Sequence, residues 1–385
     1  MLCFDAREIV ESVSDKYNGG LTYSLRMLNK IEAYASINQL HYSYLVSEKG
    51  ADYDFHFVKY GNKIVVNDDV DLVSLLKANG ISSFFSPMGY GLKNLNFDSI
   101  RALINVHGLR DIELKNNLDS LSYAKSKLEW TKFLIKYLFR NFFWARNKKN
   151  LWSVFNCKGD VEYICPSNHT KFSIVSQFNV EPARIKVVHS PLANVLPIYK
   201  ASQPNNFGFD CYLLVSGGRW IKNTLWAMLA LDDLITAGKV KRRVMVLGVS
   251  EPVKSKWRKK IKNMNHFDIF DYVDDDYLEA AYSSCFSLIY STLNEGFGYP
   301  PLEAIRHGKP VLVSAVNSLP EICSSHALYY GSNNLVDFRS RILQLEAGES
   351  GFVKSDQKEY FRTMLIKQED QYKSLFDQLF SGKDT

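Results

Sequence analysis

The sequence predicts an α/β protein built from two doubly wound domains. Short apolar runs alternate with longer stretches at helical spacing, and the runs end in polar or Gly-containing loops. Buried parallel strands have this character, because helices cover both faces of their sheet. A chain of 385 residues is long enough for two domains, each with its own core. The clearest predicted strands are 103–106, 163–165, 185–188, 212–215, 244–247, 286–290 and 311–313.

We place an N-terminal domain at residues 1–195 and a C-terminal domain at 210–355. The stretch 196–209 between them is rich in Pro, Asn and Gly, which is typical of a linker. The tail 356–385 is charged and carries apolar residues near helical spacing, so we expect an amphipathic helix there. Ligands of such sheets bind beyond the carboxyl ends of the strands.

Composition excludes several classes of protein. Hydrophobic residues make up 46% and charged residues 23%, as in globular proteins, and the net charge of +6 comes without a nucleic-acid motif. No run of 18 apolar residues and no secretory signal is visible, so we expect a cytoplasmic protein without a transmembrane helix. The cysteines show neither zinc spacing nor a disulfide framework, and we expect several to be small core residues: Cys3, Cys157, Cys165, Cys211, Cys285 and Cys323.

Two glutamates eight positions apart, Glu295 and Glu303, form the most informative pattern of the chain. Glu295 precedes the turn Gly296, Phe297, Gly298, and Glu303 lies near the start of a predicted helix. The turn and the helix N-terminus supply backbone N–H groups and a positive dipole end, which suit phosphate. Carboxylates only accept hydrogen bonds and suit sugar hydroxyls. Together these groups predict a nucleotide-sugar site.

A second glycine-rich loop, residues 215–223, follows one predicted strand and precedes a predicted helix. It contains Arg219 and Lys222 at what would be the carboxyl end of the strand. Positioned cations and backbone N–H groups can stabilise a leaving diphosphate without a metal, so we expect no cofactor and no metal site. The acidic run 274–276 precedes a helical pattern, which favours helix capping over metal binding.

The glutamate pair with Glu-Gly-Phe-Gly at 295–298, and the downstream motifs Gly-Lys-Pro-Val at 308–311 and Leu-Pro-Glu at 319–321, resemble retaining glycosyltransferases of family 4, or glycosyl transferases group 1. The resemblance implies the GT-B fold, in which two doubly wound Rossmann-like domains face a central cleft. It also implies that the last helix, residues 356–385, crosses back to the N-terminal domain.

The resemblance further implies a role for each site residue. Arg219 and Lys222 would neutralise the donor diphosphate, Glu295 would contact hydroxyls of the donor sugar, and Glu303 would hold the ribose. Val273 would lie in a loop beside the nucleobase. The implied donor-binding residues are Gly19, Gly20, Arg219, Lys222, Val273, Glu295, Gly296, Phe297, Gly298 and Glu303, and the implied catalytic residues are His107, Arg219, Lys222 and Glu295.

The N-terminal domain carries less specific signals. The pair Gly19 and Gly20 resembles the family's turn at the cleft, or is a plain connection between a strand and a helix. His107 follows a buried-strand pattern and would hydrogen-bond a donor sugar hydroxyl, or have a structural role. The family's Asp after this His is replaced by Gly108, so a role as a base is not implied.

Residues 125–149 contain eight Lys or Arg and one acid. Lys132, Lys136 and Arg140 lie at four-residue spacing on a predicted helix with Trp and Phe on a neighbouring face. This segment suits an anionic membrane surface, or is a domain helix that packs its aromatic residues inward.

We therefore expect a retaining, metal-independent glycosyltransferase that uses a UDP- or GDP-linked sugar. The acceptor would be a glycan or lipid-linked glycan in polysaccharide biosynthesis, and the enzyme could be peripheral at the inner face of the membrane. The alternatives are a noncatalytic sugar-binding scaffold and a nucleotide-sugar epimerase on the same fold.

Overall fold

A computed structural model of the chain describes residues 1–12, 19–67, 70–89, 91–192 and 210–381. The chain divides into two compact units: unit 1 is residues 1–109, 146–192 and 366–385, and unit 2 is residues 110–145 and 193–365. The predicted linker 196–209 lies outside the described residues.

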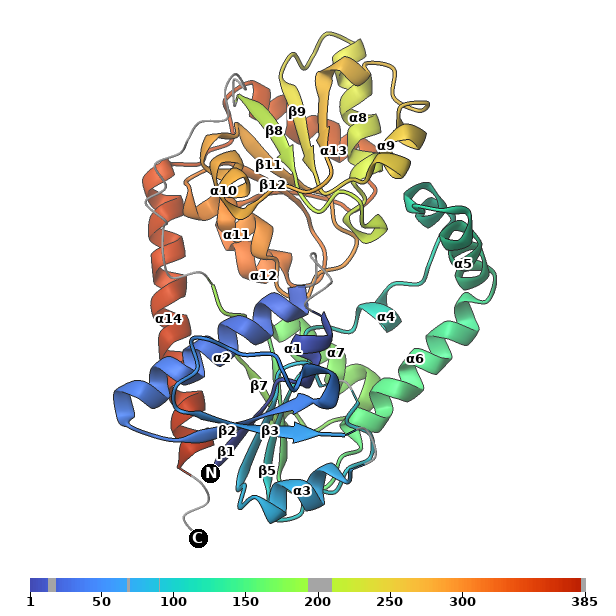
Figure 1. Ribbon diagram of the computed structural model, residues 1–385. Coiled ribbons are helices and arrows are strands. Elements are labelled where there is room, and N and C mark those ends of the chain that lie inside the picture. The colour runs from blue at the N-terminus through green and yellow to red at the C-terminus, as the bar shows by residue number, and fades with distance from the viewer. Residues whose placement is uncertain (13–18, 68–69, 90, 193–209, 382–385) are drawn as a thin grey trace. The chain divides into compact units, whose positions relative to one another are not determined.

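In the described part of unit 1, seven parallel strands form one sheet in the order β3-β2-β1-β4-β5-β6-β7 (Figure 1). The order starts at β1 in the middle, runs outward to β3, and then reverses from β4 onward, which defines a doubly wound sheet. The bounds are β1 Leu2–Asp5, β2 Tyr42–Ser47, β3 Gly61–Val66, β4 Ser83–Ser86, β5 Arg101–Asn105, β6 Val161–Cys165 and β7 Ile185–Val187.

The helices of unit 1 bury one face each against this sheet. In α2 (Gly19–Asn38), Tyr23, Met27 and Ile31 follow each other at four-residue spacing, are at most 2% exposed, and join the same core as Phe4 of β1. Ser167 caps α7 by accepting a hydrogen bond from the Thr170 amide at 3.2 Å. The other helices of this unit include α1 Arg7–Ser12, α3 Leu72–Ala78, α7 Asn168–Phe178 and the part of α6 (Arg140–Phe155) from residue 146 onward.

The described part of unit 2 repeats this plan with six parallel strands in the order β10-β9-β8-β11-β12-β13. Helices α8, α9 and α13 cover one face, and α10 and α11 lie on the other (Figure 1). The strands are β8 Cys211–Leu214, β9 Arg243–Leu247, β10 Phe267–Phe270, β11 Ser287–Tyr290, β12 Val311–Ser314 and β13 Leu328–Tyr330. The helices are α8 Thr224–Thr236, α9 Glu251–Trp257, α10 Asp275–Ser284, α11 Tyr299–Arg306, α12 Leu319–Cys323 and α13 Leu335–Glu346.

The segment 110–145 belongs to unit 2, although it precedes the boundary at 195 that the sequence predicts. It contains α4 Arg110–Glu113, the 3₁₀ helix η2 Leu118–Tyr123 and α5 Lys127–Leu138. Tyr123 is 4% exposed and packs edge-on against Trp257 of α9 with ring centroids 5.2 Å apart. Its hydroxyl also accepts a hydrogen bond from the Leu225 amide at 2.9 Å. Core packing therefore ties this segment to the C-terminal sheet.

The last helix, α14 (Lys354–Phe380), belongs to both units. Near its start, Tyr360 donates a hydrogen bond to the Ile322 carbonyl of unit 2 at 2.7 Å. In its second half, Gln368 donates to the Ser190 carbonyl of unit 1 at 2.6 Å, and Tyr372 donates to the His189 carbonyl at 2.5 Å. The second half of α14 therefore packs with unit 1.

All six cysteines are buried and none forms a disulfide, as expected for small core residues. Among the helices that the structure describes, none combines the length and the apolar character needed to cross a membrane.

Candidate active site

Two loops of unit 2 leave the sheet at the point where its strand order reverses. Strands β8 and β11 are adjacent and parallel, with Leu213 opposite Leu288, and the sheet grows in opposite directions from them. Their carboxyl ends lead into the loops 215–223 and 291–298. The helices that follow β8 and β11 lie on opposite faces of the sheet (Figure 1), and doubly wound sheets bind their ligands at such an edge.

The glycines of the first loop permit contact between two backbones. The Gly218 amide donates to the Gly248 carbonyl at 2.7 Å, and a Cβ at position 218 would lie 2.5 Å from that same oxygen. A Cβ at Gly217 would lie 2.8 Å from Val249. The group that approaches these glycines is the loop after β9, which occupies the space that a side chain at either position would need.

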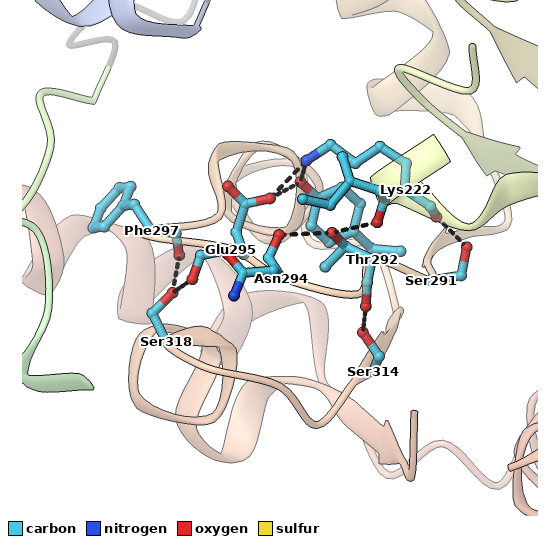
Figure 2. Close-up of polar contacts among 10 residues, drawn as sticks. Lys222, Ser291, Thr292, Asn294, Glu295, Phe297, Ser314 and Ser318 are labelled. Atoms are coloured by element: carbon cyan, nitrogen blue, oxygen red, sulfur yellow. Dashed lines mark hydrogen bonds and ion pairs between the residues drawn. The ribbon is translucent and has the colours of Figure 1, made fainter. Parts of the chain in front are cut away.

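The loop then positions Lys222. Residues Trp220–Lys222 form a 3₁₀ turn, and Asn223 adopts a left-handed conformation (φ 53°) before α8 begins. The Lys222 ammonium lies 2.6 Å from the Glu295 carboxylate and also contacts the Tyr290 hydroxyl. The Tyr290 hydroxyl donates to the same Glu295 oxygen at 2.5 Å. Figure 2 shows the Lys222 and Glu295 side chains directed toward each other.

The two loops are joined along their backbones as well. Ser291 donates to the Lys222 carbonyl at 2.7 Å, and the Leu293 amide donates to the Ile221 carbonyl at 2.7 Å. The hydroxyl of Ser318 lies 3.1 Å from the carbonyl of Glu295 and donates to it (Figure 2). The cation and the carboxylate are therefore presented by one connected backbone network rather than by independent loops.

Burial and neighbouring charges shift the pKa values of Lys222 and Glu295 in opposite directions. Burial raises the pKa of Glu295, but the Lys222 ammonium, the Tyr290 hydroxyl and Arg219 outweigh it and hold that pKa below its ordinary value. Burial lowers the pKa of Lys222, and Glu295 opposes this shift only in part. Burial and the neighbouring Glu295 raise the pKa of Tyr290 well above its ordinary value, so the phenol stays protonated and donates.

Arg219 is exposed at the rim of this cluster. Its guanidinium acts on the pKa of both Lys222 and Glu295, which places its charge close to the pair. Because Lys222 and Glu295 neutralise each other, Arg219 supplies the excess positive charge among the three. The predicted residues Arg219, Lys222 and Glu295 thus come together at one edge of the sheet.

Gly298 ends the second loop and begins α11. Its φ of 105° favours glycine, and a Cβ there would lie 2.6 Å from Leu319. Phe297 is 4% exposed, and its carbonyl accepts a hydrogen bond from Ser318 at 3.3 Å. Pro300 and Pro301 occupy the first turn of α11, where a missing N–H costs nothing. The fixed turn keeps the Gly296–Gly298 backbone beside Glu295.

Glu303 is in a different polar group. Its carboxylate lies 3.0 Å from the Arg306 guanidinium, which also contacts Glu279, and His307 lies 2.8 Å from Glu279. The structure therefore places Glu303 on α11 with a cation already beside it, whereas Glu295 pairs with Lys222. Contact of Glu303 with a ribose stays a prediction.

Val273 is half-buried in the turn between β10 and α10. The next residue, Asp274, caps α10 by accepting a hydrogen bond from the Tyr277 amide at 2.7 Å, as expected for the acidic run. Within the described ranges, no three His, Cys, Asp or Glu side chains gather in a way that could hold a metal ion.

In unit 1, His107 follows β5. Burial lowers its pKa to about 4, although a hydrogen bond with the Pro87 backbone acts in the other direction, so the ring is neutral at pH 7. Tyr23 packs edge-on against it with ring centroids 4.6 Å apart, and the Asn105 amide lies 3.1 Å from its Nε2.

Gly108 has a φ of 153°, which side chains rarely adopt. Gly19 and Gly20 begin α2. Roles of these residues toward a donor stay predictions.

Sequence reasoning missed Tyr290, Asn294 and Glu113. Tyr290 is the last residue of a predicted buried strand, and its position one residue before the loop was the available signal. Asn294 donates to Glu113 at 2.7 Å, and Asn317 donates to the same carboxylate oxygen at 3.1 Å. Glu113 is 182 positions before Glu295, and nothing in its local sequence indicates this contact.

Comparison with known proteins agrees with this geometry. Residues 211–347 match the family model described as glycosyl transferases group 1. The chain is 25% identical over 197 residues to the O-antigen chain mannosyltransferase RfbU of Salmonella typhimurium, which covers 50% of this chain and 52% of RfbU. It is 35% identical over 81 residues to the serotype-specific mannosyltransferase WbdA of Escherichia coli, or 21% of this chain and 10% of WbdA. The chain thus spans about half the length of RfbU and a tenth of WbdA.

The crystal structure of a glycosyltransferase from Rickettsia africae superposes with a TM-score of 0.64 at 12% identity, covering 100% of this chain and 99% of that one. Two doubly wound parallel sheets and this match over the whole length define a protein of the GT-B fold, as the sequence predicted. Within that class, the C-terminal unit is similar to glycosyl transferases group 1 over residues 211–347.

Replacing Glu113 by Ala is expected to loosen the loop 293–298. The substitution removes the acceptor shared by Asn294 and Asn317, and a hydrogen bond to a charged group contributes about 1.5 kcal/mol or more. Amide hydrogen exchange in this loop should become roughly tenfold faster. Because Glu113 is exposed, the melting temperature should change little.

Two further variants serve as controls. Glu113→Gln keeps an acceptor oxygen and should exchange at an intermediate rate, and Asp111→Ala on the same helix should leave the loop unchanged. Identical loop exchange in Glu113→Ala and the wild type would contradict a positioning role for this carboxylate.

Proposed function

We propose that the protein is a retaining glycosyltransferase that moves a sugar from a nucleotide-sugar donor to a glycan acceptor. The observation that carries the proposal is the buried contact of Lys222 with Glu295 and Tyr290, beyond the carboxyl ends of β8 and β11. A diphosphate requires cations and a sugar requires acceptors, and both kinds of group meet here.

The proposed reaction breaks the bond between the sugar anomeric carbon and the diphosphate oxygen, and it forms a bond from an acceptor hydroxyl to that carbon on the same face. The leaving phosphate receives the proton of the acceptor hydroxyl. Negative charge that grows on the diphosphate is stabilised by Arg219, by Lys222 and by backbone N–H groups of the 296–298 turn. Glu295 holds hydroxyls of the donor sugar.

The pairing of Lys222 with Glu295 gives this scheme a defined starting state. Before the donor arrives, each group satisfies the charge of the other at 2.6 Å. A donor offers the lysine a diphosphate and the glutamate a set of hydroxyls, so both groups exchange one partner for another without being left unpaired. Such an exchange avoids the cost of a buried charge without a partner.

We further propose mannose as the transferred sugar and a polysaccharide, or its lipid-linked precursor, as the acceptor. The support is that RfbU and WbdA are both described as mannosyltransferases, and RfbU acts on the O-antigen chain. Calorimetric titration with UDP and GDP, followed by hydrolysis and transfer assays with GDP-mannose and UDP-sugars, tests donor choice. Absence of binding for both nucleotides would overturn the assignment.

Replacing Lys222 by Ala should weaken nucleoside diphosphate binding by about 1.5–3 kcal/mol or more, because charge-assisted hydrogen bonds in a buried site have this magnitude. Calorimetry with the nucleotide that the wild type binds measures the loss. Lys239→Ala, at an exposed lysine on the α8–β9 connection, is the matched control and should bind normally. Unchanged affinity in Lys222→Ala would remove this residue from the site.

Glu295→Gln and Glu303→Ala should have different effects. The first should lower turnover by a hundredfold or more, on the order expected for a lost transition-state contact. It should leave nucleotide affinity unchanged or raise it, because the lysine loses its internal partner. Glu303→Ala should weaken binding of the bare nucleotide about tenfold or more through the ribose.

Glu279→Ala is the control for Glu303. Both glutamates contact Arg306, so a loss of nucleotide affinity shared by the two variants would indicate a structural effect of Arg306. Identical profiles for Glu295→Gln and Glu303→Ala would refute the division of roles.

We propose that transfer needs no divalent metal, because side-chain cations and backbone N–H groups stand where the diphosphate would bind. EDTA should leave the rate of transfer unchanged. If EDTA abolished activity and Mg²⁺ or Mn²⁺ restored it, the proposal would fail and the acidic run 274–276 would become the first candidate for the metal.

A further inference from the structure

The short helix α4 lies against the loop that carries Glu295. Its last residue, Glu113, accepts hydrogen bonds from Asn294 at 2.7 Å and from Asn317 at 3.1 Å. Asn294 directly precedes Glu295, and Asn317 directly precedes Ser318, whose hydroxyl donates to the Glu295 carbonyl. Glu113 therefore holds α4 beside the residues that present the carboxylate of the site.

Arg110 is the first residue of α4, three positions before Glu113. The Leu114 amide donates to the Arg110 carbonyl at 2.9 Å, which closes one helical turn and puts Arg110 on the same face as Glu113. The Trp144 indole donates to the Ile112 carbonyl of this turn at 2.9 Å. The turn that presents Arg110 is therefore anchored at both Glu113 and Ile112.

The charge of Arg110 acts on Lys222, at the centre of the site. Burial is the main reason why the pKa of Lys222 lies below its ordinary value, and the positive charges of Arg219 and Arg110 lower it further. Exposed charges lose most of their influence beyond a Debye length of about 8–10 Å, so an exposed arginine with this effect lies close to the ammonium. Two arginines from distant parts of the chain therefore lie near the same lysine.

The Arg110 guanidinium is accessible to a ligand. Its side chain is 49% exposed, and its Nε lies 3.7 Å from the Asp111 carboxylate, which is 60% exposed. An ion pair of this length between exposed groups contributes little to stability. It yields readily to a bidentate contact with phosphate, which the planar guanidinium favours.

The charges of the site leave a place for a second arginine. Lys222 and Glu295 neutralise each other at 2.6 Å, so Arg219 supplies the excess positive charge among these three groups. A nucleotide sugar carries one negative charge on each of its two phosphates at pH 7. Arg110 brings a second positive charge, so the two arginines match the two phosphates. Lys222 then meets the charge that grows on the leaving diphosphate.

We propose that Arg110 is a donor-binding residue that contacts the diphosphate of the nucleotide sugar together with Arg219. This role rests on the proposed function and adds to it a cation from the segment 110–145, which precedes the linker in the chain. Glu113 positions the turn on the loop, and the guanidinium of the same turn binds the ligand.

Replacing Arg110 by Ala should weaken binding of the nucleoside diphosphate about tenfold or more, because a charge-assisted contact with phosphate is lost. Binding of the nucleoside monophosphate should weaken much less, so the variant should lose preference for the diphosphate. Arg110→Lys keeps the charge without the bidentate geometry and should bind at an intermediate level. Calorimetry with UDP, GDP and the corresponding monophosphates measures these affinities.

Two controls separate a direct contact from a structural effect. Lys115→Ala removes an equal charge from an exposed position of the same segment and should bind the diphosphate normally. Amide exchange in the loop 293–298 of Arg110→Ala should equal that of the wild type, because Glu113 still holds the loop. Faster exchange in this loop, or an equal loss of affinity in Lys115→Ala, would overturn the proposal.

Inorganic pyrophosphate offers the two phosphates without a nucleoside or a sugar. Calorimetric binding of pyrophosphate that is lost in Arg110→Ala would support the role of Arg110, even if neither nucleotide bound and the proposed function were wrong. Equally tight nucleotide binding in the wild type and in Arg110→Ala would overturn this role and leave the proposed function in place. Failure of the wild type to bind pyrophosphate and both nucleotides would overturn the two together.

A lipid-linked acceptor is also a diphosphate ester, and kinetics distinguish it from the donor. Unchanged nucleotide affinity in Arg110→Ala, with a raised KM for a lipid-linked acceptor, would assign Arg110 to the acceptor and overturn its donor role. A raised KM for the nucleotide sugar, with the KM for the acceptor unchanged, is the expected result.

Discussion

The contact between a buried ammonium, Lys222, and a half-buried carboxylate, Glu295, sets the arrangement of the loops at the carboxyl ends of β8 and β11. Leaving either charge alone there would cost about 3–5 kcal/mol, so the loops after β8 and β11 must hold the two within contact distance. The backbone bonds from Ser291 and Leu293 into the first loop accomplish this. The two loops are held rigidly, because separating Lys222 from Glu295 would leave each charge without its partner.

The fold could be predicted largely because its signals are local. The four strands predicted in the C-terminal half correspond to β8, β9, β11 and β12. Short apolar runs between glycine-containing loops are typical of buried parallel strands, so each run was a direct signal. Lys222 and Glu295 could be predicted for the same reason, because each lies in a loop that follows the carboxyl end of a strand. The order of strands in the sheet then brings the two together.

The features that could not be predicted from the sequence depend on contacts between segments that lie far apart in the chain. The assignment of 110–145 follows from Tyr123 packing on Trp257, and the Glu113 contact joins positions about 180 residues apart. A single sequence carries no periodic pattern for such pairs. Tyr290 was not predicted as a site residue, because a tyrosine in a buried strand has the pattern of a core residue. Only the structure shows that its hydroxyl donates to Glu295.

The last helix has a consequence for the order in which the protein matures. Tyr372, Leu375, Phe376 and Leu379 belong to the same core cluster as Phe4 and Leu28, at the opposite end of the chain. During synthesis these four side chains emerge only after the whole second unit has been made, so until then the first unit has an uncovered apolar surface. The domain that is made first is therefore the one that completes its core later. A chain that stops before residue 372 cannot complete the core of its N-terminal unit, although every strand of that unit has been made.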